Sequence, residues 1–189
     1  MKIVLLSLLL ATFAHAQLYS LDLFEGVGDD GIDLSFSITQ SNDVLDLLIT
    51  NDSTVRSVIT QIAFEDLYAI LPSLPVLDAW SVNNSVNISG SNNIDFSTTL
   101  GLEADPPPTR NGINSGEELL ISLGGVDYNS FIQALDSGDL RLAVHAQGIG
   151  ENEISSSYVN TPEIKPEPST SMLGAVGITM IVLRRNRTS

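Results

Sequence analysis

The chain of 189 residues contains no cysteine. A disulfide framework, a thiolate metal site and a cysteine nucleophile are therefore excluded, and the fold must rest on an apolar core. Histidine is almost as scarce, because His145 is the only one beyond the first 16 residues. One histidine cannot form a histidine-rich zinc site, and a catalytic triad would have none to spare. We expect His145 to be a structural or surface residue.

Basic residues are also rare in most of the chain. All 23 acidic residues lie between Gln17 and Pro168, and only four basic residues lie there: Arg56, Arg110, Arg141 and Lys165. Nucleic acid and anionic membrane surfaces bind to clustered lysine and arginine, so this segment repels both. The charge pattern excludes nucleic acid as a partner and leaves neutral glycan and Ca²⁺ open.

Residues 1–16 have the pattern of a secretory signal peptide. Lys2 supplies a positive charge, Ile3 to Phe13 form an apolar run, and Ala14 and Ala16 form a small-x-small cleavage site. We predict that signal peptidase cuts after Ala16 and that Gln17 becomes the mature N-terminus.

The C-terminal end has three parts in a fixed order. Pro166, Glu167 and Pro168 come first, a nearly uncharged run from Ser169 to Leu183 follows, and the basic residues are Arg184, Arg185 and Arg187. The run would span about 22 Å as a helix, against a hydrocarbon core of about 30 Å. We predict a short single transmembrane helix within residues 169–189, with the arginines as a cytoplasmic stop and residues 161–168 as a linker. A buried C-terminal core helix is the alternative.

These three parts resemble the PEP-CTERM sorting signal of Gram-negative bacteria. The resemblance covers about 24 of the 189 residues, including Gly174 and Gly177 in the apolar run, and departs from the family at Lys165, where an apolar residue is common. It implies that an exosortase recognises Pro166, Glu167, Pro168 and Ser169. It also implies an exported protein, first in the inner membrane and then at the cell surface or in an extracellular matrix tied to exopolysaccharide. The body of this chain also resembles the ectodomains that often precede such tails, in the order of GINSGE (Gly112–Glu117), a short helix ending in LDSGDLRLAVHAQGI (Leu135–Ile149) and a serine-rich final strand. This resemblance implies no activity.

Residues 17–160 alternate apolar and polar residues with a period of two, which predicts strands. We expect a hairpin from Ile32–Ile38 and Leu45–Ile49 around a turn at Ser41–Asp43. Further strands are predicted at five places: Val58–Phe64, with Val58, Thr60, Ile62 and Phe64 on one face, short strands within Ser81–Asn93, Glu118–Leu123, Leu140–Gln147 and Ile154–Val159. About eight short strands with Asn, Gly and Ser turns predict an antiparallel β-sandwich ectodomain.

One helix interrupts this pattern. Asp127 can cap it, Phe131, Ile132 and Leu135 share a face, and Gly138 can end it. A single helix cannot supply the crossovers of a parallel βαβ fold. Asp105–Pro108 is expected to be an exposed polyproline loop.

Several residue patterns invite a chemical interpretation. Asp29 with Asp30, or Glu117 with Glu118, supplies two carboxylates for glycoside hydrolysis, and Asp29–Asp33 offers oxygen ligands for Ca²⁺ but lacks the EF-hand spacing. Trp80 and Tyr68 could form a sugar-stacking platform, although an isolated Trp is more often in the core. The sequons begin at Asn51, Asn83, Asn87 and Asn186.

None of these patterns rises above chance in a chain so rich in Asp, Glu, Asn and Ser. We therefore predict no catalytic residue, metal ligand or cofactor in the body. The resemblance implies a non-enzymatic surface or matrix protein. The alternative is a secreted carbohydrate-binding, lectin-like module or a carbohydrate-active enzyme, which an exposed line of aromatics or a cleft with two facing carboxylates would favour.

Overall fold

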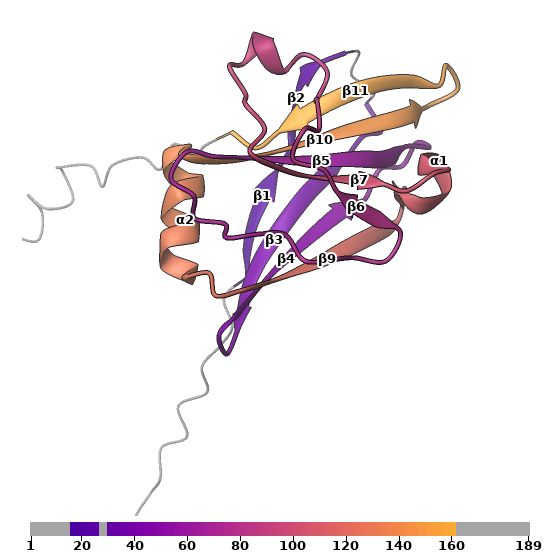
Figure 1. The fold of residues 1–189 in the computed structure, drawn as a ribbon. Helices are drawn as coiled ribbons and strands as arrows, with labels where there is room; N and C mark the ends of the chain where they lie inside the picture. The colour runs from indigo at the N-terminus through magenta and orange to yellow at the C-terminus, as the bar shows by residue number, and fades with distance from the viewer. Residues whose placement is uncertain (1–15, 27–29, 162–189) are drawn as a thin grey trace, which may run out of the picture.

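The computed structural model describes residues 16–26 and 30–161, in which two antiparallel β-sheets pack together with two short helices (Figure 1). The predicted mainly-β, sandwich-like fold is confirmed. Eleven strands occur in these residues, where about eight were predicted. The strands are β1 (Gln17–Ser20), β2 (Asp22–Glu25), β3 (Leu34–Ser41), β4 (Val44–Asn51), β5 (Val58–Asp66), β6 (Trp80–Val82), β7 (Leu100–Ala104), β8 (Ile113–Asn114), β9 (Glu117–Gly124), β10 (Leu140–Ile149) and β11 (Ile154–Val159).

The smaller sheet has four strands in the order β1-β3-β4-β9. Its centre is the predicted hairpin, in which Ser41 pairs with Val44 across a two-residue turn. Asn42 in that turn has a φ of 56°, a left-handed conformation that asparagine tolerates better than most residues. Along β3, buried residues alternate with half-buried serine and threonine, so one face of the sheet meets the core and the other faces outward.

The larger sheet has seven strands, in the order β2-β11-β10-β5-β7-β6 with β8 paired to β5. The predicted last strand has the bounds Ile154–Val159 in the structure, and the predicted strand within Glu118–Leu123 is part of β9. Strand β5 is buried along almost its whole length. This sheet is therefore covered on both faces near its centre.

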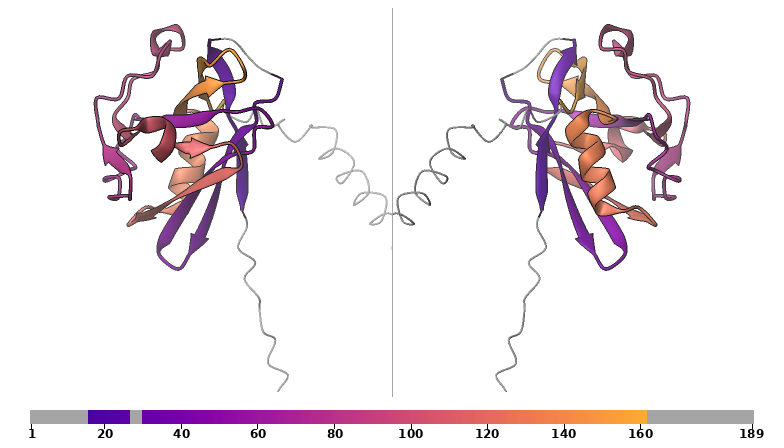
Figure 2. Two further views of the ribbon diagram at one scale, coloured as in Figure 1. Left: turned by 90° about the vertical axis from the view of Figure 1, so that its right-hand side faces the viewer. Right: turned by 90° about the vertical axis from the view of Figure 1, so that its left-hand side faces the viewer.

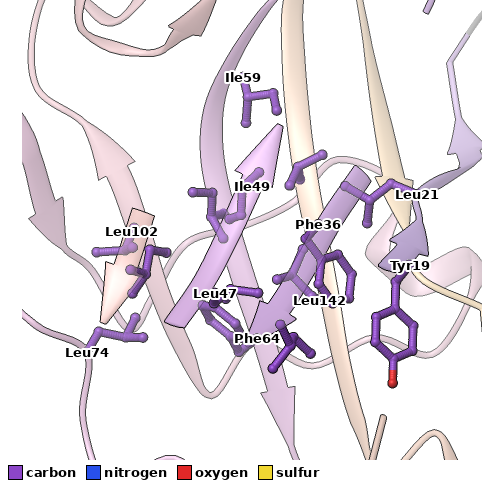
Figure 3. Close-up of a cluster of buried hydrophobic side chains, with 14 of the residues drawn as sticks. Tyr19, Leu21, Phe36, Leu47, Ile49, Ile59, Phe64, Leu74, Leu102 and Leu142 are labelled. Carbon is purple, nitrogen blue, oxygen red and sulfur yellow. The ribbon is translucent and has the colours of Figure 1, made fainter. Parts of the chain in front are cut away.

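The main core lies between the two sheets. Phe36 and Leu47 come from the smaller sheet, and Phe64 and Leu142 come from the larger one (Figure 3). All four side chains are almost fully buried. Tyr19 stacks on Phe36 with 4.9 Å between ring centroids, which anchors β1 to the core.

Two α-helices occur in the described residues, where one was predicted for the ectodomain. Helix α2 (Tyr128–Ser137) confirms the prediction, because Asp127 accepts a hydrogen bond from the Ser130 N–H at 2.8 Å and Gly138 ends the helix with a φ of 82°. Helix α1 (Pro108–Asn111) replaces the end of the expected polyproline loop. Proline at a first helical position lacks only an N–H that would have no partner there, so Pro108 can begin a helix.

The segment 83–99, which we name the β6–β7 loop, corrects the predicted strands within Ser81–Asn93. Strand β6 ends at Val82, and only a 3-10 turn, Ser91–Asn93, follows. The apolar residues Val86, Ile88 and Phe96 are buried against Ala63 and Ala143 on the outer face of the larger sheet. Figure 2 shows the loop on the side of the larger sheet away from the smaller one.

A β-bulge corrects the predicted face of β5. Gln61 pairs with His145 and Ile59 pairs with Ala146, so Thr60 has no partner in the register. The extra residue reverses the alternation, and Ile59 joins the main core with Ile62 and Phe64. The prediction that Val58 and Thr60 share a face with Ile62 and Phe64 is therefore wrong.

Candidate functional site

The predicted sorting residues lie outside the described residues, apart from two at the signal cleavage site. Residues 1–15 and 162–189 include Ala14, Pro166, Glu167, Pro168, Ser169, Arg184, Arg185 and Arg187. Ala16 is exposed and Gln17 begins β1. None of the helices in the described part of the chain is long and apolar enough to cross a membrane.

A line of polar side chains crosses the outer face of the larger sheet, and we name it the polar row. Cross-strand pairing places one residue from each of six strands in this line: Ser81, Glu103, Gln61, His145, Ser157 and Glu25. Directly paired residues point to the same face of a sheet, so these side chains share one surface.

Hydrogen bonds connect the polar row to itself and to the β6–β7 loop. The Gln61 amide donates to Glu103 Oε1 at 3.3 Å, and Asn83 donates to Glu103 Oε2 at 3.1 Å. At the other end, Asn93 donates to Glu25 Oε2 at 2.5 Å. Hydrogen bonds therefore join the β6–β7 loop to the polar row at Glu103 and at Glu25. The row lies beside the apolar cluster that the loop covers.

His145 and Ser157 are the pair in this row whose side chains could take part in a reaction. His145 Nδ1 lies 3.0 Å from Ser157 Oγ, a distance typical of an activated nucleophile. Ser157 is, however, 0% exposed, so its hydroxyl cannot reach a substrate in this structure. Burial lowers the pKa of His145, and a neutral imidazole satisfies the buried hydroxyl. The geometry is that of a structural pair.

The predicted carboxylate pair that the structure describes, Glu117 with Glu118, does not form an acid and base facing across a cleft. Glu117 and Glu118 are neighbours on β9, so their side chains point to opposite faces. Glu117 accepts hydrogen bonds at 2.9 Å from both the side chain and the backbone N–H of Asn114, and these lower the pKa of Glu117. It fixes the β8–β9 turn. In the other pair, Asp29 lies outside the described residues.

The predicted Ca²⁺ turn is only partly described. Asp30 and Asp33 are both exposed, and the Gly31 carbonyl accepts a hydrogen bond from the Thr54 N–H at 2.8 Å. Within residues 16–26 and 30–161, no three histidine or carboxylate side chains gather as metal ligands would.

The predicted stacking platform is not present, because its two aromatics have opposite environments. Trp80 is 5% exposed and belongs to the main core, whereas Tyr68 is 71% exposed. Asn51, which begins a sequon, is also buried. Its amide donates to the Ile113 carbonyl at 3.0 Å and its Oδ1 accepts from Ser57 Oγ at 3.2 Å, so its role is structural.

An open hollow of about 490 Å³ lies where the connection from β4 to β5 meets the turn between β10 and β11. Its lining includes Val55, Gly150 and the exposed ion pair of Arg56 with Glu153, whose atoms are 3.0 Å apart. Arg56 is already paired with Glu153, and Glu151 is the other charged residue of the lining. The hollow has no constellation that specifies a reaction.

Sequence reasoning identified His145 but missed Gln61, Glu103, Ser157 and Glu25 as its neighbours in the row. Each is a polar residue within a strand, and His145 itself lies within the predicted strand Leu140–Gln147. The missing information was the strand order, which brings together β2, β5, β7 and β11. A one-dimensional pattern does not contain it.

Fold and site together define a cysteine-free, acidic, antiparallel β-sandwich-like domain with a polar row on one outer face. Comparison of the chain with protein-family models, with curated proteins and with solved structures found no match.

Proposed function

We propose that this is an exported, non-enzymatic surface or extracellular-matrix protein that carries a PEP-CTERM sorting signal. In this proposal, signal peptidase removes residues 1–16, the chain is held in the inner membrane by its C-terminal helix, and an exosortase recognises Pro166, Glu167 and Pro168. The released or anchored body is associated with exopolysaccharide at the cell surface.

One observation supports this proposal most directly. Both apolar clusters of the described residues lie between Tyr19 and Val159, inside the predicted ectodomain. Strand β1 begins at Gln17, the predicted mature N-terminus, and Gln17 pairs with Ile38. At the other end, Thr161 Oγ1 donates to Asp22 Oδ2 at 2.6 Å. The packed domain therefore fits between the two predicted processing sites.

The test is intact-mass spectrometry of the protein from its own cells, separated into membrane, surface and medium fractions. We expect a mass that begins at Gln17 and ends near Pro166–Thr170. Replacing Pro166, Glu167 and Pro168 with alanine is expected to leave the full C-terminus in the inner membrane. Replacing Pro162 and Glu163 is a matched control, because it removes the same residue types outside the triplet. A mature wild-type mass that retains Arg184–Ser189 would refute sorting by an exosortase.

The polar row supports a second candidate, a carbohydrate-binding module for neutral glycan. The Gln61 amide, the Glu25 and Glu103 carboxylates and the Ser81 hydroxyl suit sugar hydroxyls, but no exposed line of aromatics accompanies them in the described residues. Pull-down on neutral polysaccharides with wild type and Gln61→Ala tests this candidate. Equal retention of the two proteins would remove the row as the binding site.

A further inference from the structure

The four sheet edges of this fold are very unequal. Strands β1 and β2 have four residues each and β6 has three, whereas β9 has eight. Short edge strands protect natural sheets from pairing with other chains. Only β9 departs from this protection among the edges of the described sheets.

Strand β9 also pairs on one side only. Its eight residues, Glu117–Gly124, match Val44–Asn51 without a bulge, and β4 is its only strand partner in the described part of the chain. In an antiparallel pair, alternate residues turn their backbone N–H and C=O groups away from the partner. Among the described residues, no backbone hydrogen bond outside the strand ladders reaches residues 118–124. The backbone groups on the outer side of β9 therefore have no backbone partner within the described part of the chain.

The side chains of β9 do not block this edge. The strand has no proline and no lysine, and its six residues from Leu119 to Gly124 are uncharged. Leu120 is 52% exposed on the outer face. A Cβ atom added at Gly124 would meet nothing within 4 Å, so the face that Gly124 shares with Leu120 is uncovered at this end of the strand.

We propose that β9 pairs antiparallel with β9 of a second copy of this chain, joining two smaller sheets into one of eight strands. In the two-fold register centred on Leu120, Leu120 faces Leu120 of the copy, and Leu119 faces Ile121. Glu118 then faces Ser122 and Glu117 faces Leu123. No acid lies opposite an acid, although the body as a whole is strongly acidic.

The outer face of the smaller sheet favours the same register. Pairing aligns Leu18, Ser37, Leu48 and Leu120 in one row across the four strands. A two-fold axis at Leu120 extends this row across the interface, where the same four residues follow in reverse order in the second copy. Leu120 of one copy then lies opposite Leu120 of the other. A parallel arrangement would instead bring the acidic ends of the two β9 strands together. Pairing of two eight-residue strands buries less surface than a standard protein–protein interface, which buries about 1,200–2,000 Å². We therefore expect the association to be reversible.

The absence of cysteine allows a direct test in the full-length chain in mild detergent. Directly opposed residues have Cα atoms about 4.5–5.5 Å apart, which a disulfide can join. We expect Leu120→Cys to give a covalent dimer on mild oxidation. Leu18→Cys is the matched control, an exposed leucine on the same face at the opposite edge. Because paired strands raise the effective concentration, we expect about tenfold more dimer from Leu120→Cys. Equal yields would show random collision and overturn the proposal.

A pair of variants tests the register. Glu118→Cys with Ser122→Cys in one chain is expected to give the dimer, whereas Ser122→Cys alone is not, because its own counterpart lies four residues along the strand. Dimer from Ser122→Cys alone, at the level of Leu120→Cys, would overturn the register.

A non-covalent measurement completes the test. Leu120→Glu places like charges opposite each other at the axis, so sedimentation equilibrium is expected to show monomer where wild type and Leu18→Glu associate. Because Leu120 is exposed, we expect the Leu120→Glu variant to fold normally, and an unchanged melting temperature would show this. Association of folded Leu120→Glu at the wild-type level would overturn the proposal. The proposal does not depend on exosortase processing, so the two can fail separately.

Discussion

The two sheets differ in what covers their outer faces. On the smaller sheet, β3 presents half-buried Ser35, Ser37 and Thr39 outward. On the larger sheet, the outward residues Ala63 and Ala143 are both 0% exposed, because the β6–β7 loop packs over them. The same antiparallel architecture therefore has one solvated outer face and one that forms a second, smaller core. Whether a loop packs over the sheet, more than the alternation along the strand, decides which outward positions tolerate a charged side chain.

The most direct way to break this comparison is to place the same charge on both outer faces. Ala143→Asp would bury a carboxylate beneath Val86 and Phe96 without a partner, so we expect a loss of more than about 3 kcal/mol of stability. Ser37→Asp adds the same group to the half-exposed face of the smaller sheet, where a change within about 0.5 kcal/mol is expected. Urea unfolding of both variants measures the difference. Similar losses would show that the loop does not seal the larger sheet.

A smaller effect is expected from the ion pair that fastens the loop to the larger sheet. Arg141 contacts the Glu65 carboxylate, donates to the Ile94 carbonyl at 3.0 Å and lies 5.3 Å from the Phe96 ring centroid. Arg141→Met leaves Glu65 buried without its cation, so we expect a loss of about 2–3 kcal/mol.

A control variant of Arg141→Met separates the effect of the unpaired Glu65 charge from the effect of lost packing. Glu65 also accepts a hydrogen bond from the Ser97 N–H at 2.8 Å. Adding Glu65→Gln to Arg141→Met removes the orphaned charge, and the double variant is expected to recover part of the stability. Faster proteolysis within residues 83–99 should accompany Arg141→Met. A loop that stays as resistant as in wild type would contradict this role of Arg141.

The smallest effect concerns the polar row and pH. Burial holds the pKa of His145 below its ordinary value of 6.5, so the unfolded chain takes up this proton first as the pH falls. His145 therefore contributes a loss of stability that begins near the unfolded pKa and levels off below the folded one. His145→Gln cannot take up this proton.

The measurement is the urea midpoint of wild type and His145→Gln at pH 7.5 and 5.5. We expect a slightly larger fall for wild type between the two pH values. Glu25 and Glu103, which lie two strands away on either side of His145 in the row, are present in both proteins, so the comparison isolates the imidazole. Equal falls would mean that His145 has no linked protonation.

Local patterns predicted much of the body correctly. The β3–β4 hairpin, α2 between its Asp127 and Gly138 caps, and the final strand Ile154–Val159 all depend on neighbours within about ten residues. These signals are physical properties of short segments, such as a capping carboxylate or a period-two alternation, and they do not need the rest of the fold.

The failures have a common cause in long-range packing. Residues 83–96 alternate like strands, but their apolar side chains pack on the outer face of the larger sheet. Local turn hydrogen bonds, such as that from the Asn93 N–H to the Gly90 carbonyl at 2.8 Å, take the place of a ladder. The bulge at Thr60 depends on pairing with β10, about 85 residues away. Trp80 looked available as a sugar platform, but only the packed core shows that it is buried.

Residue order alone shows the acidic, cysteine-free composition, the two end segments with their sorting-signal resemblance, and a body made mainly of alternating strands. Composition and local periodicity are written directly in residue order. Tertiary packing sets which faces are covered, brings Gln61, His145 and Ser157 into one row, and makes β9 the longest edge strand of the two described sheets. These properties follow from strand order and register, which are set by burial summed over contacts far apart in the chain.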